Sequence, residues 1–153
     1  MGEEILIDPE STISIDPVSR RGEIVMNNQG MVGKGYKIKT TKPDDYTVKP
    51  NIGIIHPLQK SVIEIIVQPK TKISSEHKFL IEVYNFDWRR GAEKFKEFLK
   101  ETKEPPIIKR MLSIKLNEPI IKEFNFKSKK VYEIVCLVII FIQFLLLVYK
   151  MLS

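Results

Sequence analysis

The sequence has very few of the residues that build metal sites, disulfides and most enzyme active sites. It contains one cysteine, Cys136, so neither an intrachain disulfide nor a cysteine metal cluster can form. The two histidines, His56 and His77, stand alone, without a partner at metal-ligand spacing. No Gly-x-Ser-x-Gly or comparable nucleophile motif occurs. We therefore expect no catalysis, no metal and no cofactor.

Signals for export and for nucleic-acid binding are also missing. The chain begins with acidic residues and only three apolar ones, and it holds no Asn-x-Ser/Thr sequon, so we expect a reducing, cytosolic compartment. The net charge of +6 is spread thinly, with 20 Lys/Arg against 17 Asp/Glu in residues 1–118. A domain so mildly basic does not point to nucleic acid as a partner.

The most informative stretch is 36–57. Its first half alternates as a half-buried strand does. One side carries Tyr36, Ile38 and Thr40, and the other carries Lys37, Lys39 and Thr41. Three prolines, Pro43, Pro50 and Pro57, then break the stretch into short extended pieces with rigid corners. We predict a cis peptide bond before Pro50.

The basic side of this stretch admits two interpretations. Lysine and threonine are common on exposed strands, so this side can simply be solvated. Alternatively, its ammonium and hydroxyl groups bind an acidic peptide or phosphate. The groups concerned are those of Lys37, Lys39, Thr40, Thr41, Lys42 and Lys49.

The rest of the first 117 residues repeats this pattern of short strands. Extended pieces are predicted at 5–7, 12–15, 22–28, 61–68, 78–84 and 110–116. In the piece at 78–84 the apolar side chains of Phe79, Ile81 and Val83 alternate onto one face, which is expected to point inward. One helix is predicted over about 90–102, where Ala92, Phe95, Phe98 and Leu99 form an apolar stripe and Glu93–Lys96 and Glu97–Lys100 can pair. Short strands with frequent turns and one helical insertion indicate an all-β, immunoglobulin-like β-sandwich.

Three ordered motifs carry a resemblance to a known family. They are Lys39-Thr-Thr-Lys-Pro, Tyr46-x-Val-Lys-Pro-Asn-x-Gly-Ile-Ile-x-Pro57 and His77-Lys-Phe-Leu80. Together they resemble the major sperm protein (MSP) domain of the VAMP-associated proteins (VAP), over roughly the first three quarters of the chain. The sequence departs from the family at His56, usually acidic there, at Ile52, often serine, and at Leu80, where many members have methionine.

The resemblance implies a receptor for FFAT motifs, short acidic peptides with two phenylalanines that occur in cytosolic and lipid-transfer proteins. By resemblance, Thr40 and Thr41 with Lys39 would meet the peptide backbone and its acidic core. Lys78 would pair with a carboxylate, and Leu80 would line the pocket for an aromatic ring. Further basic contacts would come from Lys37, Lys42, Lys49 and Arg110. A phosphoinositide-binding membrane tether and an MSP-type structural scaffold remain alternatives.

The C-terminal quarter has a different character. Residues 118–130 are predicted to be a short linker without a coiled coil, and 131–149 a transmembrane tail anchor about 28 Å long. More lysines precede this segment than follow it, so the domain should face the cytosol, and the length suits the endoplasmic reticulum. Gln143 could support a weak homodimer within the membrane.

Overall fold

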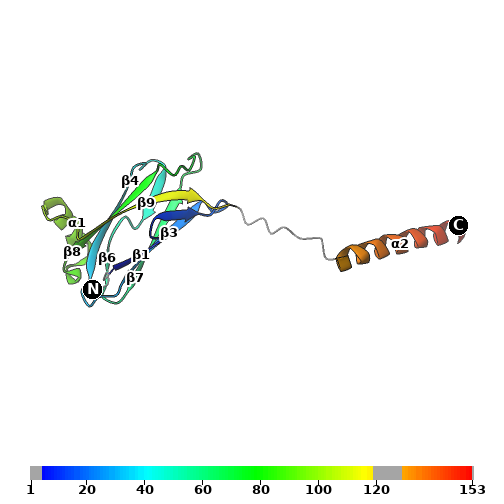
Figure 1. The fold of residues 1–153 in the computed structure, drawn as a ribbon, viewed down its shortest axis with the longest axis horizontal. Coiled ribbons are helices and arrows are strands. Elements are labelled where there is room, and N and C mark those ends of the chain that lie inside the picture. The colour runs from blue at the N-terminus through cyan, green and yellow to red at the C-terminus, as the bar shows by residue number, and fades with distance from the viewer. Residues whose placement is uncertain (1–4, 119–128, 153) are drawn as a thin grey trace. The chain divides into compact units, whose positions relative to one another are not determined.

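Alternating apolar residues in the first part of the chain build two facing β-sheets. The computed structural model describes residues 5–118 and 129–152 (Figure 1). In the first sheet the strand order is β1-β3-β7-β5, with antiparallel pairs throughout. Its strands are β1 (Ile5–Asp8), β3 (Arg21–Asn28), β7 (Lys60–Val67) and β5 (Tyr46–Lys49).

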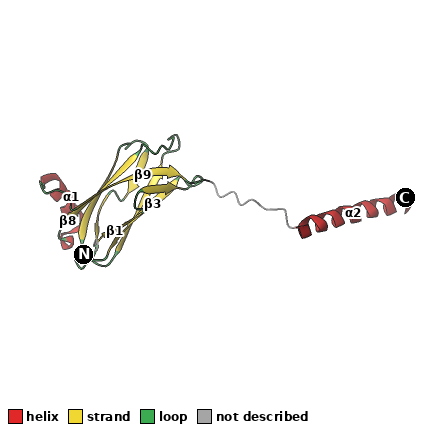
Figure 2. Cartoon of the chain, in the orientation of Figure 1, coloured by secondary structure: helices red, strands yellow, loops and turns green. Residues whose placement is uncertain are grey.

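The second sheet has the order β2-β9-β8-β4-β6, in which β2 runs parallel to β9 and the other pairs are antiparallel. Figure 2 shows its strands in yellow together with those of the first sheet. The predicted immunoglobulin-like sandwich is confirmed. The strands of this sheet are β2 (Thr12–Ile15), β9 (Ile108–Leu116), β8 (Lys78–Asn85), β4 (Lys34–Thr40) and β6 (Ile52–Ile55).

The main core lies between the sheets and is built largely from β-branched residues. In β8 the predicted inward residues Phe79, Ile81 and Val83 are all fully buried. Strand β3 contributes Ile24 and Met26 from the opposite sheet in the same way. Each such side chain stabilises the fold by roughly 1.5–3 kcal/mol when it leaves water. The period of two along each strand therefore determines which side chains remain outside.

The stretch 36–57 is divided between the two sheets, which the sequence did not reveal. Strands β4 and β6 pair in the second sheet, whereas β5 pairs with β7 in the first. Tyr46 and Val48 lie opposite Val67 and Ile65, so β5 completes the core on that side. The Lys49–Pro50 peptide bond between β5 and β6 is cis, as predicted.

The predicted helix is present as a short 3-10 turn, Trp88–Arg90, followed by α1, Gly91–Glu101. The helix packs on the outer surface of the second sheet, against β6 and β4. Phe95 is fully buried beside Tyr84 and Phe86 in a second apolar cluster. A side chain at Gly35 would come within 2.3 Å of the Phe95 ring, so glycine allows the helix to approach β4 closely.

One of the two predicted ion pairs on α1 is confirmed. The Lys96 ammonium lies 2.7 Å from a Glu93 carboxylate oxygen. Glu97 instead pairs with Lys94, at 2.8 Å, so its predicted pairing with Lys100 is wrong. Lys94 and Lys100 are each three residues from Glu97 on the helix. The Glu97 side chain points toward the preceding turn and therefore pairs with Lys94. The Lys94 hydrogen bond and charge also lower the pKa of Glu97.

The chain divides into two units, Met1–Pro119 and Ile120–Ser153, and the core described above belongs entirely to the first. In the second unit α2 extends over Lys129–Leu152. Of the predicted linker, residues 119–128 lie outside the described part of the chain. Within the described residues, no helix combines the length and apolarity needed to cross a bilayer. A helix is thus present over the expected residues 131–149. Its predicted role as a membrane span is not confirmed.

Candidate functional site

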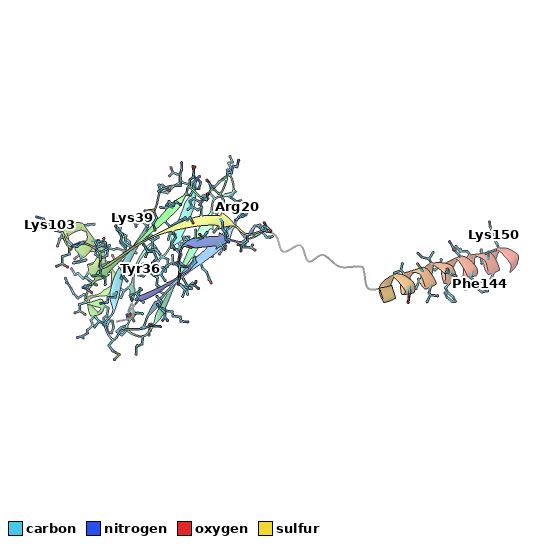
Figure 3. All side chains as sticks on the ribbon, in the orientation of Figure 1. Arg20, Tyr36, Lys39, Lys103, Phe144 and Lys150 are labelled. Carbon is cyan, nitrogen blue, oxygen red and sulfur yellow. The ribbon has the colours of Figure 1, made fainter. Side chains whose placement is uncertain are left out.

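The outward side chains of three neighbouring strands form a mixed basic and apolar surface. Cross-strand register places Lys39 of β4, Leu80 of β8 and Met111 of β9 in one row. The adjacent inward residues Ile38 and Ile81 are buried, so this row faces outward. Lys39 is labelled in Figure 3. We call this surface the β4-β8-β9 face, and it consists of Lys37, Lys39, Lys78, Leu80, Glu82, Lys109 and Met111.

At one end of the face, two hydrogen bonds join Thr41 and Lys78. The Thr41 N–H donates to the Lys78 carbonyl at 3.0 Å, and the Lys78 N–H donates to the Thr41 hydroxyl at 3.1 Å. The Lys78 ammonium donates to the Ser75 carbonyl at 2.9 Å. Since a hydroxyl both donates and accepts, Thr41 keeps a proton for a ligand carbonyl or carboxylate.

Next to Thr41, the hydroxyl of Thr40 accepts the backbone N–H of Lys42 at 3.2 Å. Thr40 lies opposite the buried Phe79 in register, so it shares the inward side of β4, at its end. The hydroxyl therefore shapes the turn that presents the exposed Lys42. This arrangement gives Thr40 a structural task beside any contact with a ligand.

The centre of the face is apolar. Leu80 is half-buried, and Met111, directly opposite it, leaves 57% of its surface exposed. Directly opposite side chains on neighbouring strands have Cβ atoms about 5 Å apart, so the two form one contiguous apolar patch. A patch of this kind between ammonium groups suits an aromatic ring whose neighbours along the chain are acidic.

A buried carboxylate lies beside this patch. The Lys39 ammonium is 2.8 Å from Glu82 Oε2, and the Glu82 side chain is only 8% exposed. The Tyr84 hydroxyl donates to the same oxygen at 3.3 Å. Burial raises the pKa of Tyr84, and the negative charge of Glu82 adds to that rise. In register, Glu82 lies directly between Lys37 and Lys109.

The structure brings most of the predicted site residues together. Lys37, Lys39, Lys78 and Leu80 share the β4-β8-β9 face, and Thr41 lies at its end beside Lys78. Thr40 and Lys42 complete the adjacent turn.

Two predicted residues lie elsewhere. Lys49 is opposite Glu64 on the outer side of the first sheet. Arg110 is opposite the buried Ile81, on the inward side of β9, where it lines a hollow with Leu6, Asp8 and Glu10. In a strand, a shift of one position moves a side chain to the other side of the sheet.

The sequence interpretation missed Lys109, Met111 and Glu82. Lys109 and Met111 alternate with Leu112 and Ile114, which are buried, so the parity of β9 was a usable signal for the first two. The pairing of Glu82 with Lys39 has no such signal, because it depends on the register of β8 against β4.

The fold and this face define the class: an immunoglobulin-like β-sandwich with a mixed basic and apolar face on its second sheet. Comparison with known families is more specific. The profile of the MSP (Major sperm protein) domain matches residues 4–104, so the chain belongs to the MSP domain family. None of the curated proteins compared with it matches.

Solved structures agree on the fold. WR4, an MSP family member of C. elegans, has a TM-score of 0.59 at 15% identity over 76% of this chain and 100% of its own. SSP-19, an MSP-domain-like protein of Caenorhabditis elegans, has a TM-score of 0.53 at 15% identity over 73% of this chain and 98% of its own. A Salmonella enterica complex of SafA pilin with the SafB chaperone has a TM-score of 0.51 at 9% identity, over 77% of this chain and 56% of its own. At such identities the likeness concerns the fold alone.

Proposed function

We propose that this MSP domain is an adaptor that binds acidic peptides with two phenylalanines, the FFAT-like motifs that VAMP-associated proteins bind. The observation that carries the proposal is the meeting of Lys39, Lys78 and Leu80 on one face, with Thr41 at its end. These residues come from separate motifs of the sequence, and each motif resembles the VAP pattern. A single exposed leucine would need no explanation, but Leu80 and Met111 together place a contiguous apolar patch between the ammonium groups.

In this proposal an extended peptide lies across β4, β8 and β9. One aromatic side chain rests on the Leu80–Met111 patch, where it loses contact with water. Carboxylates approach the ammonium groups of Lys39 and Lys78, and the Thr41 hydroxyl donates to the peptide. Lys109 takes the part first expected of Arg110, because Lys109 is the one that faces outward.

The charges at the margin of the face act mainly on the rate of association. Lys37 and Lys42 carry no ion pair among the described residues, and both lie on or next to the face. Exposed ammonium groups attract an acidic segment over about a Debye length, roughly 8 Å at physiological salt. Salt should therefore slow association more than it speeds release. The expected dissociation constant is micromolar, as in small polar interfaces.

We also propose that α2 attaches the chain to the membrane of the endoplasmic reticulum, with the domain in the cytosol. Residues 131–149 have only Glu133 and Gln143 as strongly polar side chains. Large apolar side chains of α2 are exposed, among them Phe141, Phe144 and Leu147, each by more than 60%. A helix with so much apolar surface requires a covering, and lipid provides one. Among the described residues no helix meets the length and apolarity of a bilayer span, so the proposal rests on this exposed apolar surface.

An adaptor of this kind would hold cytosolic and lipid-transfer proteins at membrane contact sites. Its valency depends on α2, because a coiled coil was not expected in the linker. Gln143 is exposed on α2 and could hydrogen-bond across a helix pair, which would give a weak homodimer. Such a contact is worth about 1 kcal/mol or less, so the dimer would depend on protein density in the membrane.

The proposal is tested by a double substitution at the end of the face, Thr41→Asp with Lys78→Glu. The aspartate oxygen can still accept the Lys78 N–H, so the fold should persist while the charge of the site is reversed. Full-length protein in non-ionic detergent is titrated against a fluorescent acidic diphenylalanine peptide. We expect binding to disappear with an unchanged melting temperature. Wild-type affinity in the double variant would show that the site is assigned to the wrong residues.

A further inference from the structure

We propose that Glu82 is a specificity-determining residue of the β4-β8-β9 face, an inbuilt anion that weakens the binding of a ligand carboxylate at Lys39. The inference rests on the proposed function, since it concerns the same surface and the same acidic ligands. It assigns to Glu82 a role opposite in sign to that of the surrounding lysines.

The position of Glu82 is unusual for an acidic side chain. It is the one carboxylate among the seven residues that define the face, and its side chain is 8% exposed. Its Oε2 atom is 2.8 Å from the Lys39 ammonium and accepts the Tyr84 hydroxyl at 3.3 Å. Lys37 and Lys109 lie directly opposite it on the two neighbouring strands. Its charge is therefore held between two lysines of the face, in the row next to the apolar Leu80–Met111 patch.

Lys39 can serve Glu82 and a ligand at once, and this makes their charges compete. An ammonium group has three N–H donors, and the Lys39 side chain is 48% exposed, so its outer side is open to a ligand. Two carboxylate oxygens that share one ammonium at normal hydrogen-bond length lie about 5 Å apart. Both carry negative charge, and Glu82 is too buried for water to screen it fully.

The size of the effect follows from that separation. Two unit charges about 5 Å apart repel each other by an amount equivalent to about fourfold in affinity in bulk water, and a few hundredfold at an effective dielectric constant of 20. The outer side of Lys39 is exposed, which favours the lower part of this range. We expect removal of the Glu82 charge to strengthen acidic-peptide binding about tenfold.

The same geometry selects among ligands. A peptide that brings a neutral group to Lys39 and a carboxylate to Lys78 avoids the repulsion, whereas a peptide with a carboxylate at Lys39 does not. Glu82 should therefore favour peptides whose acidic residues are spaced rather than continuous. Loss of its charge should raise affinity most for continuous acidic tracts.

The experiment compares wild type with Glu82→Gln, in which an amide oxygen still accepts from Lys39 and Tyr84 while the charge is gone. Glu93→Gln is the matched control, because it removes the same charge and a lysine pair of 2.7 Å on helix α1. Binding to full-length protein in non-ionic detergent is measured by microscale thermophoresis. The labelled probes are an acidic diphenylalanine peptide and tetraglutamate, which has no aromatic residue.

We expect Glu82→Gln to bind the acidic diphenylalanine peptide about tenfold more tightly and tetraglutamate, a continuous acidic tract, by a larger factor, and Glu93→Gln to stay within twofold of wild type. Equal or weaker binding by Glu82→Gln would overturn the inference, and so would an equal gain in the control. If the diphenylalanine peptide binds no variant, the proposed function fails and tetraglutamate alone decides the inference. Glu82→Thr, which suits a strand and keeps a hydroxyl, provides the same comparison if the glutamine variant does not fold.

Discussion

Replacing Phe95 by alanine should remove most of what holds helix α1 on the sandwich. Phe95 is fully buried, and its ring lies 5.0 Å from that of Phe86 and 6.0 Å from that of Phe98. Phe→Ala in a core typically lowers the free energy of unfolding by about 3–5 kcal/mol, through lost transfer energy and the cavity left behind. Gly35 lies beneath the ring without a side chain, so β4 cannot fill that cavity.

This loss is large beside the total stability of a domain, which is about 5–15 kcal/mol. With a urea dependence of about 2 kcal/mol per molar, the midpoint of unfolding should fall by about 2 M. The melting temperature should fall by about 4 °C per kcal/mol, or roughly 12–20 °C. Phe98→Ala is the control: Phe98 is half-buried in the same cluster and should cost about 1–2 kcal/mol.

Trp88 makes the assay specific, because it is the single tryptophan and lies at the start of this helical segment. Its fluorescence reports on the docking of the segment, while circular dichroism reports on the sheets. In wild type we expect the fluorescence and circular dichroism transitions to have the same urea midpoint. In Phe95→Ala we expect the fluorescence transition to occur at a lower urea concentration than the circular dichroism transition. An unchanged midpoint in Phe95→Ala would refute the conclusion that the second cluster stabilises the fold.

Two more predictions concern the face and α2. Lys109→Glu should weaken binding of the acidic diphenylalanine peptide about tenfold. Lys49→Glu, a charge reversal on the other sheet, should change the affinity by less than threefold in the same titration. Equal losses in the two variants would mean that the binding surface extends beyond the β4-β8-β9 face. Full-length protein should float with neutral liposomes and a 1–118 fragment should sediment; flotation of the fragment with phosphoinositide liposomes alone would favour the membrane-tether alternative.

Much of the fold follows from periodicity that can be read in the sequence. The burial of Phe79, Ile81 and Val83 and the packing of Phe95, Phe98 and Leu99 were predicted correctly, whereas Ala92, expected on the same helical stripe, is exposed. Such features depend on each element's own pattern of apolar residues, which is local. The same parity in β9 would have separated Lys109 from Arg110, and the sequence interpretation did not use it.

Other features depend on contacts between distant residues and had no local signal. The sequence around Tyr46 predicts a strand but does not say which sheet it joins. The Glu82–Lys39 pair requires β8 and β4 to meet in one particular register. Glu97 turning to Lys94 rather than Lys100 is a choice between two rotamers of nearly equal spacing. None of these features can be predicted from the spacing of residues within a single segment.

The central claim is that acidic diphenylalanine peptides bind the β4-β8-β9 face. Its most direct test is titration of isotope-labelled protein with such a peptide, followed residue by residue by nuclear magnetic resonance. The account predicts the largest shifts at Lys39, Thr41, Leu80 and Met111, with little change at Lys49 in the other sheet. Shifts concentrated on the first sheet or on α1, or none at millimolar peptide, would contradict it.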